Sequence, residues 1–391
     1  MSEMSYLEKL LDGVEVEWKT LGSIAELKRG TSITKKDVID GTIPVVAGGR
    51  TPAYYHNTSN RDGQTIVIAG SGAYAGFVSW WEEPIFVSDA FTVKPHNILL
   101  PRYCYHFLMN MQQQLHEFKS GGGVPHVYPR DVSPILIPIP CPDNPEKSLA
   151  IQSEIVRILD KFTALTAELT AELTAELTMR KNQYNYYRDQ LLSFEESEVE
   201  WKTLGEIAAY SKSRISFDKL DKNNYVGVDN LLQNRAGKMQ SNYVPTSGNL
   251  TEFREGDILI GNIRPYLKKI WQADSTGGTN GDVLVIRSCH KSILPRYLYQ
   301  ILADDNFFEY NMQHAKGAKM PRGNKDAIMK YRVPIPSFDE QTRIVTILDK
   351  FDRLTNSISE GLPREIELRQ KQYEYYRDLL FSFPKPEIAS N

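Results

Sequence analysis

The chain has 391 residues and a formal net charge of −3 at pH 7. This length allows two or more domains, and the charge excludes a uniformly basic protein, so any nucleic-acid surface has to be a local patch. The three cysteines are too few and too far apart for a disulfide framework or a zinc site, which favours a reducing cytoplasm. We expect no secretion signal in the polar start of the chain, and no segment apolar enough to cross a membrane.

Short runs of β-branched and aromatic residues occur in two separate regions, divided by turns rich in glycine and asparagine. Such runs predict strands. We therefore expect each region to be a compact, mostly β unit with one or two short helices, at about Arg102 to Phe118 and about Arg296 to Met312. The predicted strands are Ile66–Ile68, Ile85–Val87, Phe91–Val93, Ile258–Ile260 and Val283–Ile286.

A long helix is predicted between the two regions. No glycine or proline occurs from Ser148 to Phe194, and Thr166 to Leu177 reads TAEL three times, in residues that favour helix. A helix from Gln152 to Phe194 would be about 64 Å long, which suits a spacer that lies against a partner helix. The leucines recur at every fourth position and form one slowly rotating apolar stripe; they are Leu165, Leu169, Leu173 and Leu177.

The partner helix is predicted near the end of the chain, because the phrases of the first helix recur there. Ile158–Phe162 (ILDKF) returns as Ile347–Phe351, and Tyr186–Asp189 (YYRD) returns as Tyr375–Asp378. We expect the two helices to match in length and in apolar seam. The positions that correspond to the four leucines are Leu354, Ile358, Leu362 and Ile366.

Two local signals mark the start and the middle of this second helix. Ser337 and Glu340 have the spacing of a capping box, which predicts the helix N-terminus. Gly361 and Pro363 predict a kink or a break further along.

Repeats extend over the rest of the chain. Glu15–Gly22 (EVEWKTLG) returns unchanged as Glu198–Gly205, and Leu100–Tyr103 (LPRY) returns as Leu294–Tyr297. Tyr6–Val16, at the start of the chain, resembles the tail of the first long helix. The repeat pattern at the start of the chain therefore continues the pattern at its end, which suggests a closed arrangement.

These patterns predict an α+β fold in which two mostly-β domains are separated by two long antiparallel coiled-coil helices. The repeats make the fold pseudo-twofold and circularly closed. The expected divisions are a first domain at 1–147, the central helix at 148–194, a second domain at 195–336, and the C-terminal helix and tail at 337–391.

The repeated EVEWKTLG, the two ILDKF helices, the paired YYRD phrases and the TAEL run resemble the conserved regions of type I restriction–modification specificity subunits, of the IC group. The resemblance covers the whole chain. The two β regions resemble the family's target recognition domains only in their scaffold, and their loops are particular to this chain. It implies a non-catalytic subunit that binds a bipartite, asymmetric target in double-stranded DNA, one half per target recognition domain, with the spacer set by the long helices.

The same resemblance implies the partners. Two methyltransferase subunits would dock on the chain and methylate adenine with S-adenosylmethionine, taking the base out of the stack. Motor–nuclease restriction subunits, using ATP and Mg²⁺, would join to cleave unmodified DNA. No cofactor is then expected in this chain itself.

The residues themselves carry no complete catalytic signature. The adenine methyltransferase motif and the P-loop are absent, and the seven histidines form no metal-ligand cluster. The glycine run Gly70, Gly72 and Gly76 has the wrong spacing for a dinucleotide fingerprint, and we interpret it as turn structure. Two other functions stay open: a stand-alone coiled-coil scaffold whose β domains bind protein, and a nuclease with an unrecognised site.

DNA-binding candidates are loops in which basic, amide and aromatic side chains gather with few acids. Lys119 to Arg130 contains no acid, and Lys316 to Arg332 contains Asp326 alone. Pro125 and Pro321 lie equally far before two Ile-Pro pairs, so the loops are at equivalent places and should touch the same feature of DNA. The alternative is a pair of solvated loops. The candidates in these loops are Lys119, His126, Tyr128, Arg130, Lys316, Lys319, Arg322 and Lys325.

A second group of candidates follows a predicted strand in each region. In the second region it comprises Asn262, Arg264 and Lys268, since arginine pairs with guanine and asparagine with adenine in the major groove. The counterpart Gly70–Tyr74 in the first region is nearly uncharged, so the candidates there shift to an earlier segment. They are Arg50, Tyr54, Tyr55, His56, Asn57 and Asn60. The tyrosines near the helix ends could stack on bases, but we favour packing, with an exposed edge for methyltransferase docking.

Overall fold

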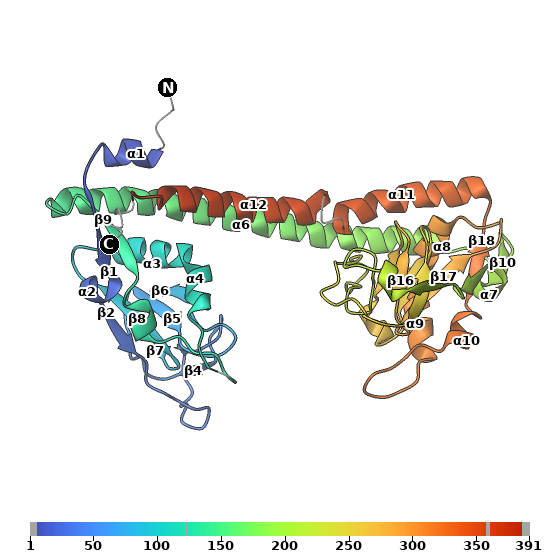
Figure 1. Ribbon diagram of the computed structural model, residues 1–391, viewed down its shortest axis with the longest axis horizontal. Helices are drawn as coiled ribbons and strands as arrows, with labels where there is room; N and C mark the ends of the chain where they lie inside the picture. The colour runs from blue at the N-terminus through green and yellow to red at the C-terminus, as the bar shows by residue number, and fades with distance from the viewer. Residues whose placement is uncertain (1–5, 122, 357–359, 385–391) are drawn as a thin grey trace. The chain divides into compact units, whose positions relative to one another are not determined.

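The computed structural model describes residues 6–121, 123–356 and 360–384. The chain divides into two compact units, one of Met1–Leu169 with Arg369–Asn391 and one of Thr170–Leu368. Each unit contains one globular domain together with part of the long helices (Figure 1). Each also has a large hydrophobic core of its own.

The first domain is mostly β, with short helices. Its elements are α1 (Tyr6–Leu11), β1 (Val16–Thr20), α2 (Leu21–Ile24), β2 (Ala25–Arg29), β3 (Ile43–Val46), β4 (Tyr54–His56), β5 (Thr65–Ala69), β6 (Val78–Trp81), β7 (Phe86–Val87), β8 (Ala90–Pro95), α3 (Pro101–Asn110), α4 (Gln112–Glu117), α5 (Pro129–Val132) and β9 (Leu136–Pro140). The main sheet is antiparallel in the order β2-β8-β5-β6, a smaller sheet has the order β4-β3-β7, and β1 pairs with β9. Every residue of the inner strand β5 is buried, as its β-branched sequence favours.

The second domain repeats this plan. Its elements are β10 (Glu200–Thr203), α7 (Leu204–Ile207), β11 (Ala208–Tyr210), β12 (Arg214–Ser216), the 3-10 helix η1 (Phe217–Lys219), β13 (Asn249–Phe253), β14 (Ile258–Gly261), the 3-10 helix η2 (Pro265–Leu267), β15 (Ile270–Gln272), β16 (Gly277–Thr279), β17 (Val283–Ser288), α8 (Pro295–Leu302), α9 (Asp305–Gln313), α10 (Lys325–Ile328) and β18 (Arg332–Ile335). The sheet order β11-β17-β14-β15 matches that of the first domain, and β10 pairs with β18 as β1 pairs with β9. The predicted strands are confirmed, and each predicted short helix is a pair of helices.

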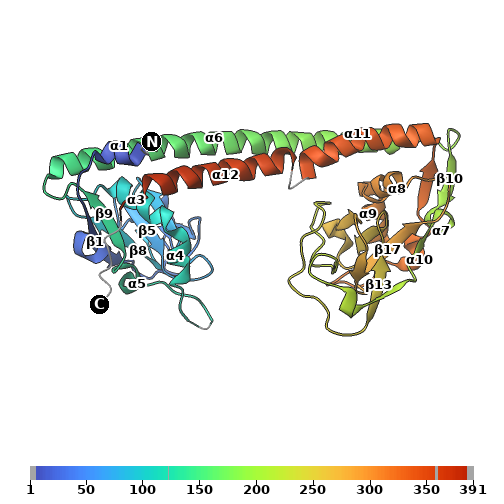
Figure 2. The same cartoon turned by 45° about the horizontal axis from the view of Figure 1, so that its top comes forward.

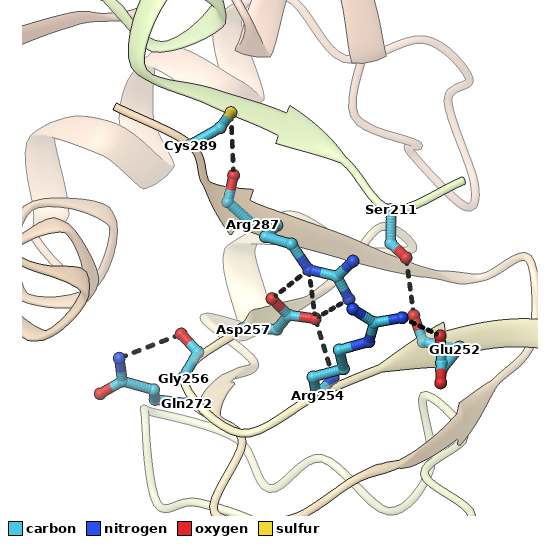
Figure 3. A network of polar contacts seen from close by, with 8 residues as sticks. All are labelled: Ser211, Glu252, Arg254, Gly256, Asp257, Gln272, Arg287 and Cys289. Carbon is cyan, nitrogen blue, oxygen red and sulfur yellow. Dashed lines mark hydrogen bonds and ion pairs between the residues drawn. The ribbon is translucent and has the colours of Figure 1, made fainter. Parts of the chain in front are cut away.

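The turn that leads into β14 is fixed by a network of polar contacts (Figure 3). The Asp257 carboxylate is almost completely buried and accepts three hydrogen bonds from the Arg287 guanidinium, at 2.9 and 3.2 Å from Nε and 2.6 Å from Nη2. Asp257 also accepts a bond of 2.8 Å from the backbone N–H of Arg254, which closes the turn. A buried carboxylate is stable only with such pairing, so this network holds the start of the strand in place.

The central helix α6 (Pro145–Leu192) has 48 residues and begins earlier than the sequence suggests. Pro145 suits the first helical position, and the Asn144 side chain accepts a hydrogen bond of 3.0 Å from the backbone N–H of Lys147. The predicted partner is two helices, α11 (Phe338–Asn356) and α12 (Gly361–Leu380). The break near Gly361 is confirmed, and the expected match in length to α6 is wrong because of it.

The pairing of the long helices is antiparallel within each unit. In the first unit the end of α12 lies alongside the first half of α6 (Figures 1 and 2), with Phe162 stacked on Tyr376 at 5.1 Å between ring centroids. In the second unit Tyr184 stacks on Phe351 of α11 at 5.9 Å. Tyr184 is buried, which agrees with a packing role for the tyrosines, whereas Tyr186 is 61% exposed.

The TAEL leucines do not form a buried seam. Leu169, Leu173 and Leu177 are half-buried, and Leu165 is 50% exposed. A step of four residues turns a helix by about 400°, so successive leucines move gradually off the face that meets the partner. In the partner, Leu354, Leu362 and Ile366 are also half-buried, and Ile358 lies outside the described residues.

Helix α1 and the segment that ends α12 both pack on the first domain. Leu7 and Leu11 of α1 share its core with Leu380 and Phe381 at the end of α12. The indole Nε1 of Trp18 in β1 also donates a hydrogen bond of 2.7 Å to the backbone oxygen of Pro384. The closure expected from the repeats is therefore present inside this unit.

The repeated LPRY and ILDKF phrases meet each other in both units. Arg102 of α3 donates through Nε to Asp160 of α6 at 2.8 Å, and Arg296 of α8 donates in the same way to Asp349 of α11 at 2.7 Å. We call these two ion pairs the arginine–aspartate clamps. Each clamp fixes the short helix of a domain to a long helix.

A buried glutamine supports each clamp. Gln152 of α6 accepts a hydrogen bond of 2.9 Å from the backbone N–H of Leu100, at the start of α3. Gln341 of α11 does the same for Leu294, also at 2.9 Å, at the start of α8. Each glutamine thus satisfies an N–H group that a helix start leaves without a partner.

One residue beside the clamps differs between the units. In the second unit Gln300 donates to Asp349 at 2.9 Å, whereas in the first unit the buried His106 ring donates from Nε2 to Asp160 at 2.7 Å. Burial lowers the pKa of His106, although the Asp160 carboxylate opposes this shift.

We predict that His106 makes the stability of the first unit depend on pH. The unfolded chain takes up the proton near pH 6.5, above the lowered pKa of the folded state, so the free energy of unfolding falls as the pH falls through about 6.5. His106→Gln, which copies the second unit, should remove this part of the dependence. Urea unfolding of the variant and the wild type between pH 5 and pH 8, with hydrogen exchange to locate the change, measures it. Equal pH profiles would contradict the prediction.

Candidate nucleic-acid interface

The two basic loops close in the same way. In the first domain Ser120 and His126 exchange backbone hydrogen bonds of 3.0 and 2.8 Å. In the second domain Lys316 and Arg322 exchange two bonds of 2.9 Å. Both loops follow the second short helix and precede α5 or α10.

Each loop is also attached to the segment that follows β5 or β14. The backbone N–H of Gly72 donates to the Pro125 oxygen at 2.9 Å, and the N–H of Arg264 donates to the Pro321 oxygen at 2.7 Å. The equivalence of Pro125 and Pro321 expected from the sequence is thus confirmed. Two chain segments therefore form one surface in each domain.

The two domains differ in which side chains this scaffold carries. Gly72 and Gly76 have φ of +81° and +83° in the first domain, so the interpretation of the glycines as turn structure is confirmed. The matching positions in the second domain are Arg264 and Lys268, with φ of +52° and +50°. A residue with a Cβ costs about 1–3 kcal/mol in this conformation. The second domain retains two basic side chains where glycine would be less strained.

The basic loop of the second domain is open to solvent. Lys316, Lys319, Arg322 and Lys325 are exposed, and so is Arg264 beside them. Arg322 donates from Nη1 to Asp282 at 2.5 Å. Lys316, Lys319 and Arg264 form no ion pair with any residue that the structure describes. These cations are free to meet phosphate.

The loop of the first domain presents rings as well as charge. His126 and Tyr128 are stacked with ring centroids 5.8 Å apart, and Arg130 lies 4.8 Å from the Tyr128 centroid. Arg29, at the end of β2, lies over the same ring at 5.2 Å and was missed by the sequence analysis. Arg29, His126 and Tyr128 line a cavity of about 310 Å³. Lys119 is less available, because its Nζ donates to the Ala73 oxygen at 2.9 Å.

The candidates at residues 50–60 of the first domain fall into two groups, side chains that are exposed and side chains that bond inside the domain. Arg50 is exposed and lies over the Tyr74 ring at 4.9 Å, and Asn57 and Tyr55 are exposed, with Tyr54 half-buried. Asn60 is committed internally, since its amide donates to the Val87 oxygen at 2.9 Å and accepts from the Val87 N–H at 2.7 Å. The buried His56 ring is bonded to the backbone of Ile39.

Two candidates in the second domain also point inward. Asn262 is only 5% exposed, so it cannot reach a base without rearrangement. Lys268 donates to the Asp305 carboxylate at 2.7 Å. Arg264 is the member of this group whose side chain stays exposed, whereas Asn262 is buried and Lys268 is paired with Asp305.

Two further findings bear on other classes of function. Among residues 6–121, 123–356 and 360–384, no group of three or more His, Cys, Asp or Glu side chains is placed to hold a metal ion. No helix in this described part of the chain is both long and apolar enough to span a membrane.

Comparison with known proteins decides the family. The model of the type I restriction modification DNA specificity domain matches residues 13–179 and again residues 196–368. The chain belongs to the specificity subunits of type I restriction enzymes. It is 40% identical over 432 aligned residues to the EcoR124I/EcoR124II specificity subunit of Escherichia coli, with 100% of both chains covered. It is 34% identical to the EcoprrI specificity subunit of Escherichia coli, with 92% of this chain and 93% of that protein covered.

Solved structures of this family share the fold. The type I S subunit from M. genitalium has a TM-score of 0.50 at 17% identity, covering 98% of this chain and 100% of that one. A chain from a study of complex assembly in a type I R-M system has a TM-score of 0.59 at 16% identity, with coverage of 94% and 98%. As a specificity subunit, the chain has the recognition role in the enzyme rather than a catalytic one.

The hypothesis that the matched loops contact DNA phosphate predicts a change in salt dependence. Replacing Lys316, Lys319 and Arg322 by alanine should weaken binding and reduce the slope of log K against log salt by about 0.9 for each lost contact. Fluorescence anisotropy of labelled DNA, measured over an about fourfold range of salt concentration from about 50 to 200 mM, gives the slope. The control removes three exposed positive charges elsewhere, at Lys291, Lys350 and Arg353. A wild-type slope in the loop variant would show that the loop does not touch phosphate.

Proposed function

We propose that this specificity subunit reads a bipartite, asymmetric target in double-stranded DNA, one half through each domain. The observation that carries the proposal is the pair of matched loop surfaces. The backbone attachments of the two surfaces are equivalent, while their side chains differ. The first surface carries rings, glycines and exposed arginines, and the second carries exposed lysines and arginines. A common scaffold with different side chains is what recognition of two unlike sequences requires.

The proposed partners follow from the family. The chain would dock two methyltransferase subunits and motor–nuclease restriction subunits, which would bring S-adenosylmethionine, ATP and Mg²⁺. Tyr186 and Tyr375 occupy equivalent positions on α6 and α12 and are 61% and 63% exposed. Exposed tyrosines are frequent in protein interfaces, and two equivalent ones suit two copies of one partner. The TAEL run further supports membership of the IC group.

The decisive experiment exchanges one domain. Replacing about Gly22 to Ile137 with the equivalent region of a relative should change one half of the methylated sequence and leave the other half unchanged. The physical reason is that the first domain has its own sheets and loops, while the two ends of the exchanged segment lie in α2 and β9, which have counterparts in α7 and β18 of the second domain. Sequencing of methylated sites in a host that carries the whole system measures the outcome. A change in both halves would contradict independent reading.

The long helix is proposed to set the spacer between the two half-sites. Deleting Thr174 to Leu177 removes about 6 Å of helix and turns the remainder by a net angle of about 40°. One base-pair step turns DNA by about 34–36° and rises about 3.4 Å. A deletion of three residues would instead turn the helix by about 60° in the opposite sense. Four residues is therefore the length change that best preserves both the helix pairing and the facing of the domains.

We accordingly predict that removal of one TAEL unit shortens the non-specific spacer of the target by one base pair, with both half-sites unchanged. Methylation-site sequencing of the deletion strain reads the spacer directly. A three-residue deletion in the same run serves as the control and should abolish or strongly reduce methylation. An unchanged spacer after the four-residue deletion would rule out the helix as the measuring element.

A further inference from the structure

The second unit contains a cavity of about 310 Å³ that the recognition of DNA bases does not explain. It lies between the last part of α6 and two loops of the second domain, at 234–235 and at 268. Its walls are rich in positive charge. The charged side chains that line it are Lys181, Arg188, Arg235, Lys268 and Asp305.

The cations of this cavity outnumber the acids. Arg235 and Lys268 both donate to the same oxygen of Asp305, the lysine at 2.7 Å, so one carboxylate serves two cations. Burial, followed by the nearby Arg188 charge, lowers the pKa of Arg235 to about 10. Asp304 and Asp189 line a neighbouring cavity, and the Asp304 charge acts on Arg235 and Lys268 from there. A partly buried group of like charges is unfavourable unless counter-charge is supplied.

Arg188 is the least compensated of these cations. It is 2% exposed, its guanidinium lies 4.0 Å over the Tyr184 ring, and its Nε has no hydrogen-bond partner among the described residues. The equivalent Arg377 in the first unit donates from Nε to the Asn110 side chain at 2.9 Å. The same arginine is thus satisfied in one unit and left with a free donor in the other.

The backbone holds these side chains in place at a cost. Asn234, Arg235 and Lys268 all have positive φ, of +54°, +63° and +50°. Their loops are tied together, because Asn234 donates to the Leu267 oxygen at 2.9 Å and Arg235 donates to the Lys268 oxygen at 3.0 Å. Such strain persists where the surroundings enforce it and is concentrated at functional sites.

We propose that this cavity is a binding site for a phosphate-type oxyanion. The donors would be the guanidinium groups of Arg188 and Arg235 and the ammonium group of Lys181. Lys181 lines the cavity, is exposed and forms no ion pair with a described residue. Guanidinium groups bind phosphate through paired N–H donors. Bound phosphate would balance the surplus charge and join α6 to the loop that carries Arg264. The phosphate is either a free ion or a group of the DNA backbone.

Calorimetric titration of the full chain with inorganic phosphate, at constant ionic strength, tests the site. We expect one saturable site in the wild type and binding weaker by about tenfold or more in Arg188→Gln, the loss expected for a hydrogen bond to a charged group. Arg377→Gln is the matched control, because it removes the equivalent arginine from the first unit. Lys181→Gln, at an exposed position, keeps the test valid if Arg188→Gln fails to fold. No saturable binding, or equal binding by wild type and both second-unit variants, would overturn the proposal.

A measurement of DNA binding distinguishes the two possible sources of the phosphate, the free ion and the DNA backbone. If the site takes a DNA phosphate, free phosphate should compete with DNA, and Lys181→Gln should lower the salt slope by about 0.9. If the site takes the free ion, DNA binding in phosphate-free buffer should be the same in wild type and variant. The titration with inorganic phosphate does not depend on the proposed function, so failure of DNA reading and failure of this site can be told apart.

Discussion

The arginine–aspartate clamps are the constraint on which the rest of each unit depends. Arg102 with Asp160, and Arg296 with Asp349, connect the short helix that packs on a domain's sheet to a long helix. Both partners are partly exposed, so the ion pair alone contributes modestly. Its importance lies in geometry, because the buried glutamines at 152 and 341 fix the start of the same short helices. The orientation of each domain on its helix, and of its loops, follows from these contacts.

The pseudo-twofold plan separates framework from recognition. The contacts that recur in both units join strands, short helices and long helices, whereas the side chains that differ lie on the loops. Positions 72 and 264 show this separation most clearly: the backbone conformation and the hydrogen bond to a proline oxygen are shared, but one residue is glycine and the other is arginine. A loop can therefore change its side chains without disturbing the core. In the second domain the strained arginine adds about 1–3 kcal/mol of cost that the rest of the fold has to offset.

Much of the framework could be predicted from the sequence, because it is encoded by local patterns and exact repeats. The TAEL run, the strand-forming stretches and the capping serine at 337 each specify their structure through neighbours in the chain, and Glu340 indeed donates its N–H to the Ser337 side chain at 3.3 Å. The individual site residues could not be predicted in this way. Asn60, Asn262 and Lys268 are all plausible base-contacting residues in the sequence. In the fold, Asn60 bonds to Val87, Lys268 bonds to Asp305 and Asn262 is buried, and each of these outcomes depends on segments distant in the chain. Arg29 was missed for the same reason, since only the fold brings it to Tyr128.

The closure of the first domain has a consequence for the order in which the protein is made. Its core contains Leu7 and Leu11 of α1 together with Leu380 and Phe381, which are translated after the whole of the second unit. Domains usually fold as units, the N-terminal one first during synthesis. Here the second unit, Thr170–Leu368, is complete in sequence before the first one is. The first domain must therefore wait, with part of its apolar core uncovered, until the end of α12 has been made.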